Sequence, residues 1–296
     1  MKDTLFGRKY NVTIGNRRLS SDEFTIYFDI PFDDGPNPNI AEIEIYNLKD
    51  STINLIKEGQ KVILNAGYQS DVGTILDGVV RMPETEWKRV DKVTTIHVLD
   101  GNDDWMEKQV KKTYKEDVTG KQILTDLLKL SGLKTGSFVL PLNMVYKNGK
   151  TIKDTVGKAI VDIAQDCNAK VHVNRGKIFI REKAKGDNRG FILDRSRGLI
   201  GSPTPIEKKE EYNVAKKVEK KTKKNGKTVV TYETEYQEKS KTRRGWKVVS
   251  LMHHRITTDS IIKISSNTAN GLFRVEKGRH YCNGSSYYTE IECFPI

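Results

Sequence analysis

The chain has 296 residues, of which 36% are hydrophobic and 30% are charged, and its formal net charge is +12. At roughly 100–200 residues per domain this length predicts two or three domains. No apolar run approaches the roughly 20 residues of a membrane span, and the N-terminal MKDTLFGRKY lacks the apolar stretch of a signal peptide. We therefore expect no membrane span and synthesis in the cytoplasm. The odd number of widely spaced cysteines argues against disulfides and structural zinc; they are Cys167, Cys282 and Cys293.

The N-terminal part of the chain, residues 1–101, is predicted to be a β-barrel domain. Short segments rich in Val, Ile, Thr and Tyr recur with turn residues between them, as in an all-β barrel or sandwich. These segments are NVTIG, FTIYFDI, AEIEIYNL, KVILNAGY, TILDGVV and TTIHVLDG. The three prolines in Pro31 to Asn39 predict a loop. Asp50 to Glu58 is predicted to form one or two helical turns opened by an Asp or Ser cap.

Residues 102–190 are predicted to be an α/β insertion domain in which two helices pack on a short sheet. Thr119 followed by Gln122 is a capping-box pattern. The apolar residues that follow recur at helical spacing, and Gly132 ends the run. A second helix is expected from about Thr155, because apolar residues again share one helical face.

Two hairpins are predicted from their turn residues. KVHV and KIFIR flank Asn174-Arg175-Gly176, where the glycine can supply a positive φ. Asn225-Gly226 separates two arms rich in Lys, Thr and Val, which is a strong hairpin signal. This second hairpin is a basic excursion at about 207–245 from a predicted C-terminal β-barrel domain, residues 191–296. The fold class expected is thus mainly β with an α+β insertion: two small β-barrel or sandwich domains flank a two-helix α/β domain.

The positive charge is concentrated in the second hairpin. From Glu207 to Lys247 there are 14 Lys and Arg against 7 Asp and Glu, so this segment carries +7 of the net +12. Either it is a solvated Lys-rich edge that resists aggregation, or it contacts an acidic partner or nucleic acid. The candidate partner-binding residues are Lys220, Lys221, Lys223, Lys224, Tyr232, Tyr236, Arg243 and Arg244.

Residues that could carry chemistry are better explained by structure. His253-His254 is interpreted as part of a strand, where adjacent residues point to opposite faces and do not share a metal. There is no Gly-x-Ser-x-Gly motif and no phosphate-binding glycine-rich loop. Asp33-Asp34 and Asp103-Asp104 lie beside Gly35 and Asn102 and are typical of turns. We predict no catalytic residue, no metal or cofactor site, and no enzymatic activity. The late tyrosines could stack bases but are more typical of a core or interface; they are Tyr281, Tyr287 and Tyr288.

The order and spacing of five segments resemble the tail hub proteins of bacteriophages. The segments are EIEIYNL, KVILNAGY, GTILDGVV, TTIHVLDG and, much later, GLIGSP. The group includes the baseplate hubs of contractile tails and the late control D proteins. The resemblance covers most of residues 40–101, the insertion with its two helices, and the junction near 198–203.

The resemblance implies a structural protein that forms a homotrimeric ring at the distal end of the tail tube. Two small barrel domains per subunit would present a pseudo-sixfold ring to the hexameric tube. The implied partners are the tail tube protein or a distal tube initiator above, a spike or tail-tip protein below, other baseplate proteins, and DNA passing transiently through the lumen. The implied location is the virion tail of a phage, or of a tail-like bacteriocin or contractile injection system, made in the host bacterial cytoplasm. No cofactor is implied.

Two departures and two alternatives accompany this interpretation. Many hub relatives continue into a spike or peptidoglycan-cleaving domain, whereas this chain ends at Ile296, so we expect the spike to be a separate protein. The basic hairpin interrupts the C-terminal domain where shorter loops are expected. One alternative is a nucleic-acid-binding module that uses this hairpin, with affinity that falls steeply with salt. The other is a cell-wall-active tail enzyme, which requires turnover of peptidoglycan.

Overall fold

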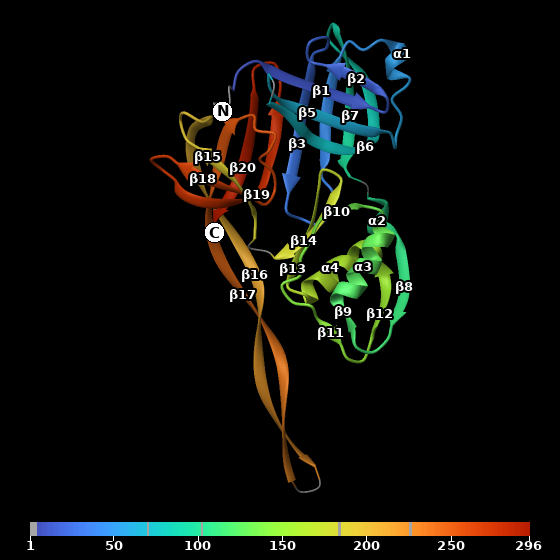
Figure 1. Ribbon diagram of the computed structural model, residues 1–296, viewed down its shortest axis with the longest axis vertical. Coiled ribbons are helices and arrows are strands. Elements are labelled where there is room, and N and C mark those ends of the chain that lie inside the picture. Colours follow the sequence, from blue (N-terminus) through green and yellow to red (C-terminus); the bar gives the residue numbers. More distant parts are fainter. Residues whose placement is uncertain (1–4, 70, 102, 183–184, 225–226) are drawn as a thin grey trace.

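The computed structural model describes the backbone of residues 5–69, 71–101, 103–182, 185–224 and 227–296, with their side chains apart from those of 189 and 210–239. Strands dominate these residues, and one long hairpin extends from the body along the longest axis of the molecule (Figure 1). The mainly β fold class predicted from the sequence is confirmed. None of the helices described is long and apolar enough to cross a bilayer.

The first strands curl round an apolar core because their side chains alternate between core and solvent. In β3 every second residue is buried, beginning at Ile26, as the two-residue period of a strand requires. The elements of this N-terminal β region are β1 (Arg8–Ile14), β2 (Arg17–Ser20), β3 (Ile26–Asp33), β4 (Ile40–Tyr46), α1 (Asp50–Ile53), β5 (Lys61–Tyr68), β6 (Asp71–Lys88) and β7 (Asp91–Asp100).

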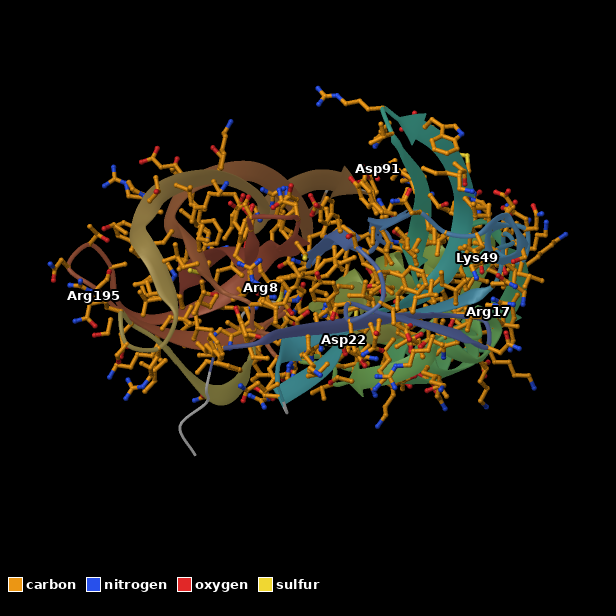
Figure 2. The ribbon with its side chains drawn as sticks, turned by 90° about the horizontal axis from the view of Figure 1, so that it is seen from above. Arg8, Arg17, Asp22, Lys49, Asp91 and Arg195 are labelled. Carbon is orange, nitrogen blue, oxygen red and sulfur yellow. The ribbon has the colours of Figure 1, made fainter. Side chains whose placement is uncertain are left out.

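A C-terminal β region lies beside the first. Figure 2 shows Arg195 of this region at one end of the body and Arg17 of the N-terminal region at the other. Its strands are β15 (Asp187–Leu193), β16 (Leu199–Lys224), β17 (Lys227–Leu251), β18 (Ser260–Ser265), β19 (Asn270–Cys282) and β20 (Tyr287–Pro295). The strands β16 and β17 form the long hairpin, and the predicted turn Asn225-Gly226 lies outside the described residues.

Between them in sequence is an α/β region with the two predicted helices. The capping box at Thr119 and Gln122 is confirmed, and Gly132 ends the first helix with φ 70°. Thr155 caps the second helix by accepting a hydrogen bond from Lys158 N. The elements are α2 (Asp104–Glu107), β8 (Gln109–Tyr114), β9 (Val118–Thr119), α3 (Gly120–Ser131), β10 (Lys134–Phe138), β11 (Val145–Tyr146), β12 (Lys150–Thr155), α4 (Val156–Asp166), β13 (Ala169–Asn174) and β14 (Lys177–Glu182).

The single turn α1 differs from its predicted start. Its N-cap residue is Lys49, without a side-chain cap, so the prediction of an Asp or Ser cap was wrong. Asp50 instead lies in the first turn and pairs with Lys92 at 2.6 Å. A carboxylate in the first turn still interacts favourably with the N-terminal end of the helix.

One continuous sheet joins the two β regions through strand β3. The order β16-β17-β20-β19-β3-β4-β7-β6-β5-β1-β2 runs across both. β4 pairs with β3 only over Ile26–Asp29, whereas β19 pairs with β3 as far as Asp33. Pro31 therefore lies within β3. The prediction of a loop from Pro31 was therefore wrong for residues 31–33. Proline is tolerated there because β4 no longer pairs on that side, so no partner needs the missing N–H.

Three apolar cores support this architecture, and one of them draws on both ends of the chain. The N-terminal core includes Met252, Cys282 and Tyr287. The Tyr287 hydroxyl donates to the Gly67 carbonyl at 2.9 Å and accepts from the Gly67 N–H at 2.8 Å. The second core lies in the α/β region and the third between the C-terminal strands. The boundaries at 101/102 and 190/191 stay a prediction.

The buried carboxylate of Asp100, at the end of β7, holds the α/β region through hydrogen bonds. The predicted hairpin of β13 and β14 is confirmed, and its turn residues Arg175 and Gly176 both have positive φ. The Asp100 carboxylate accepts their backbone N–H groups at 2.9 and 3.0 Å. The Arg175 guanidinium donates to the His254 carbonyl at 2.6 Å. Burial raises the pKa of Asp100 to about 6, although the two N–H groups oppose this.

This raised pKa predicts a pH dependence of folding. Asp100 contributes stability below its ordinary pKa of 3.8 and loses it as pH rises through about 6, because the folded state then binds more protons than the unfolded state. Asp100→Asn should remove up to about 3 kcal/mol of this dependence. Urea unfolding from pH 3.5 to 7.5 measures it. The control is Asp22→Asn, whose carboxylate side chain is 68% exposed. Parallel curves for the wild type and Asp100→Asn would contradict the prediction.

Candidate protein-interaction site at the base of the long hairpin

The base of the long hairpin is held by one buried carboxylate. Lys208 of β16 and Arg243 of β17 each approach Glu276 of β19, at 2.8 and 2.7 Å. The residue Glu276 is only 5% exposed. Two neighbouring strands therefore converge on a third through charge-assisted hydrogen bonds, which are stronger than neutral ones.

The same two cations also contact an aromatic ring. The Arg243 guanidinium lies 4.6 Å and the Lys208 ammonium 5.7 Å from the ring centroid of Phe294 on β20. A cation in this position is attracted by the negative face of the ring. Beside these residues is an open cavity of about 570 Å³, whose lining includes Asp33, Asp34 and Glu207.

The charge network continues from the hairpin base into both β regions. Arg274 of β19 contacts Glu276 at 3.5 Å and Asp34, which follows β3, at 3.2 Å. Lys170 of β13 also pairs with Asp34. The residues Asp34 and Arg274 are 8% and 5% exposed. Side chains from all three regions thus meet in one buried network.

A second arm of the network lies under β13 and β14. Arg274 and Arg181 both contact the Asp259 carboxylate, Arg181 with its Nε at 2.8 Å. His172 stacks on Phe179 with ring centroids 4.8 Å apart. Burial and the neighbouring Arg181 lower the pKa of His172 to about 3, so its ring is neutral at physiological pH.

The pKa values indicate that the hairpin base is charged at neutral pH. Burial alone would raise the pKa of Glu276, but Lys208 and Arg243 outweigh it and lower the pKa. Lys170 and Arg274 likewise lower the pKa of Asp34 against the effect of burial. A carboxylate with a lowered pKa stabilises the fold above its ordinary pKa and loses this effect in acid.

The residues predicted to bind a partner are divided between this network and the hairpin. Arg243 belongs to the buried network, whereas Arg244 is exposed and pairs with Glu207 at 3.0 Å. The remaining six lie on the hairpin strands, and their side chains lie outside the described ones: Lys220, Lys221, Lys223 and Lys224 on β16, and Tyr232 and Tyr236 on β17. Their role in binding stays a prediction.

Sequence reasoning missed the carboxylates that organise the site. Asp33 and Asp34 were both interpreted as turn residues, and Asp33 does accept the Gly35 N–H at 2.7 Å. Asp34 instead enters the network. Glu276 is one of four consecutive buried residues of β19, of which two are charged. The alternation of apolar and charged residues there is typical of a half-buried strand, so there was no signal in the sequence that Glu276 is buried.

The histidine pair and the late tyrosines occupy different environments. His253 and His254 come after the end of β17, with His254 in a turn, so their placement on a strand was wrong. The chain leaves the strand where His254 packs on Gly73, at which an added Cβ would lie 2.5 Å from the His254 ring. Burial is the main cause that lowers the pKa of His254 to about 4.

Tyr281 and Tyr288 form a tilted ring pair on neighbouring strands, with their ring centroids 5.2 Å apart.

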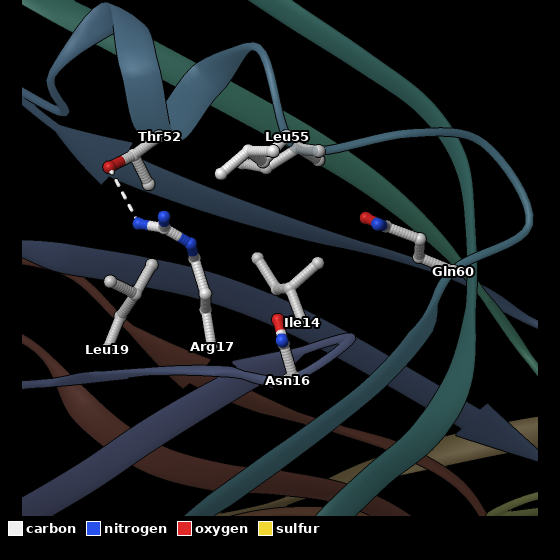
Figure 3. A pocket seen from close by; sticks show the side chains of 8 residues that line it. Ile14, Asn16, Arg17, Leu19, Thr52, Leu55 and Gln60 are labelled. Carbon is white, nitrogen blue, oxygen red and sulfur yellow. Dashed lines mark hydrogen bonds between the residues drawn. The ribbon is translucent and has the colours of Figure 1, made fainter.

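Two further features of the described residues concern metal ligation and a smaller cavity. No group of three or more His, Cys, Asp or Glu side chains within these ranges is placed to hold a metal ion. Figure 3 shows a cavity of about 180 Å³ between the turn after β1 and α1, which is smaller than typical small-molecule sites. Leu55 and Ile14 line it, and Arg17 donates to the Thr52 hydroxyl at 3.3 Å across it.

Removing the central carboxylate of the hairpin base should be destabilising. Glu276→Gln removes the buried counter-charge of Lys208 and Arg243, whose side chains are 50% and 25% exposed, so the loss should be about 1–3 kcal/mol. Thermal unfolding at pH 7 measures the change.

The matched control is Glu207→Gln in the exposed pair with Arg244, whose side chains are 60% and 86% exposed. It should change stability by no more than about 1 kcal/mol. Equal effects of the two substitutions would show that the network does not hold the hairpin base. The difference between wild type and Glu276→Gln should also shrink in acid, since protonation of Glu276 removes the same charge.

Comparison with known proteins gives a match in fold but none in sequence. No protein-family model matches the chain, and no curated protein matches it. Among solved structures, the 43 kDa tail protein of prophage MuSo2 from Shewanella oneidensis has a TM-score of 0.66 and 10% identity, covering 98% of each chain. The tail protein of Neisseria meningitidis MC58 has a TM-score of 0.62 and 10% identity, covering 98% of this chain and 97% of its own.

A third match comes from a secretion system. The Escherichia coli c3393 protein, a type VI secretion component described as similar to the T4 tail proteins gp27 and gp5, has a TM-score of 0.60 and 11% identity. The match covers 96% of this chain and 76% of that one. The chain therefore has the fold of phage tail proteins, and the resemblance to the tail hub group is confirmed at the level of the fold.

Proposed function

We propose that this chain is a non-catalytic tail hub that forms a trimeric ring at the distal end of a phage tail or tail-like particle. The observation that carries the proposal is the match of almost the whole chain to two tail proteins of nearly the same extent. A match confined to one β region would suit a general barrel module. A match across both regions and the insertion supports a shared architectural role.

The joined β regions suit a ring that changes symmetry. Each chain contributes two β regions in one continuous sheet, so three chains would present six β regions to a hexameric tube. The shared sheet and the buried charge network hold the two regions in one relative orientation. A rigid arrangement is what an adaptor between a tube and a threefold tip requires.

The proposed partners follow from this position in the tail. The tail tube protein or a distal tube initiator would bind one side of the ring, and a spike or tail-tip protein the other. A chain of the PdpA-VgrG complex from Francisella is another match, with a TM-score of 0.55 and 8% identity over 99% of this chain and 59% of that one. That match in fold to a chain solved with a partner supports a role in assembly.

The mass of the protein in solution tests the ring. Multi-angle light scattering over a range of concentration and salt should give about 101 kDa for three chains of 33.7 kDa, either alone or in complexes formed after addition of tube and spike proteins from the same particle. A single-chain mass under all of these conditions would overturn the proposal. Binding to DNA that weakens steeply with salt would instead favour the nucleic-acid-binding alternative.

Shortening the long hairpin should separate folding from assembly. Deleting residues 216–238 leaves residues 213–215 as a turn between Tyr212 and Lys239, which are opposite each other in the ladder. The hairpin base remains, so thermal stability should stay within about 1 kcal/mol of the wild type. Binding to a ring neighbour or a tail partner should weaken at least tenfold. Normal assembly of the shortened chain would mean that the distal hairpin has no role in it.

A further inference from the structure

The long hairpin has two arms of equal length, whose first residues pack on the body at Glu276 and Phe294 and whose remainder extends beyond it. Its ladder is unbroken from Ile206 opposite Gly245 to Lys224 opposite Lys227, which is 19 residues on each strand. At roughly 3.3 Å per residue each arm is about 60 Å long. In Figure 1 this part of the hairpin extends beyond the α/β region and away from both β regions.

Both outer edges of this hairpin are free of strand partners in the described chain. β16 is the last strand of the sheet and pairs only with β17. β20 pairs with β17 only from Trp246 to Leu251. Each outer edge therefore presents a row of backbone donors and acceptors that can pair with another strand. A two-stranded ribbon of this kind is also marginally stable by itself.

Prolines protect the base of the hairpin from such pairing but not its arms. Pro203 and Pro205 lie on the outer strand β16 next to the body. Proline on an edge strand blocks the approach of a further strand. Between Ile206 and Leu251 the sequence contains no proline. The proline-free length therefore corresponds to the two 19-residue arms, where only charged side chains oppose edge pairing.

Pro205 identifies which residues of the arms have backbone N–H groups that point to the outer edges of the hairpin. Because proline has no N–H, the pair Pro205 and Trp246 cannot be a hydrogen-bonded pair of this ladder. In an antiparallel ladder the two kinds of pair alternate. Along their own strands, Lys209 and Ser240 are each an even number of residues from this pair. Their N–H groups therefore point to the outer edges.

We propose that the hairpins of three copies of this chain pair edge to edge, the β16 edge of one copy with the β17 edge of the next, to close a six-stranded antiparallel barrel. The proposal rests on the threefold ring of the proposed function and names how its subunits join. Side-by-side hairpins that run in one direction place each β16 next to a β17 of opposite direction. Closure by threefold symmetry then leaves no unpaired edge, as in any barrel.

Charge gives this pairing a distinctive salt dependence. The segment from Glu207 to Lys247 has a net charge of +7 in sequence, so three hairpins repel each other at low ionic strength. Salt screens such repulsion. The barrel should therefore form more readily as salt is raised, which is the opposite of the behaviour of a nucleic-acid complex.

Hydrogen–deuterium exchange on the full-length protein tests the proposal. In the single chain, only the inward N–H groups of the arms are in a ladder, so about half of the amides of 206–224 and 227–245 should exchange quickly. In the trimer, alone or with the tube and spike proteins, nearly all should be protected. A trimer in which the arms exchange as in the single chain would overturn the barrel and leave the ring intact.

Two edge variants locate the contact. Lys209→Pro and Ser240→Pro each remove one outward N–H and place a ring on opposite outer edges, so each should weaken trimer formation at least ~tenfold. Lys209→Ala and Ser240→Ala lose the same side chains but keep the N–H, and should assemble as the wild type does. Unchanged assembly of both proline variants, with thermal unfolding like that of the wild type, would overturn the proposal. Absence of any trimer would remove the ring and this inference together.

Discussion

The pairing of β3 with β19 is the contact on which the rest of the structure depends. Six residue pairs, from Phe28–Cys282 to Asp33–Lys277, join strands that are about 250 residues apart in sequence. They turn two curled sheets into one and bring Tyr287 of the last strand into the N-terminal core. Everything between them, including the α/β region, must therefore fold back to a junction that this pairing defines.

The buried charge network reinforces that junction and extends it to the hairpin. Asp34, Arg274 and Glu276 connect the end of β3 to β19, and Lys170 and Lys208 add the α/β region and β16. A buried network of this kind adds little net stability over an apolar core, but a missing member leaves a neighbour uncompensated. Its effect is to favour one relative placement of the three regions, which suits a proposed adaptor between tail components.

The long hairpin contrasts with this body. Its base is held by Glu276 and Phe294, whereas its arms extend beyond any strand partner in the described chain. In a ring, the body would provide the fixed geometry and the arms a free edge for another copy. The proposed pairing of copies would account for prolines at the base and their absence from the arms.

Local patterns in the sequence determined most of the elements and little of their arrangement. Alternation predicted the strands of the N-terminal region, and the Thr119–Gln122 box and the turn at Gly176 were predictable because each depends on neighbouring residues. Pro31 was misjudged because its place in a strand depends on where β4 stops and β19 continues. Of the candidate site, the sequence indicated Arg243 but not its partner Glu276, 33 residues away. The shared sheet, the charge network and the free edges were decided only by tertiary structure, because strand pairing and the burial of charge depend on residues that are distant in the chain.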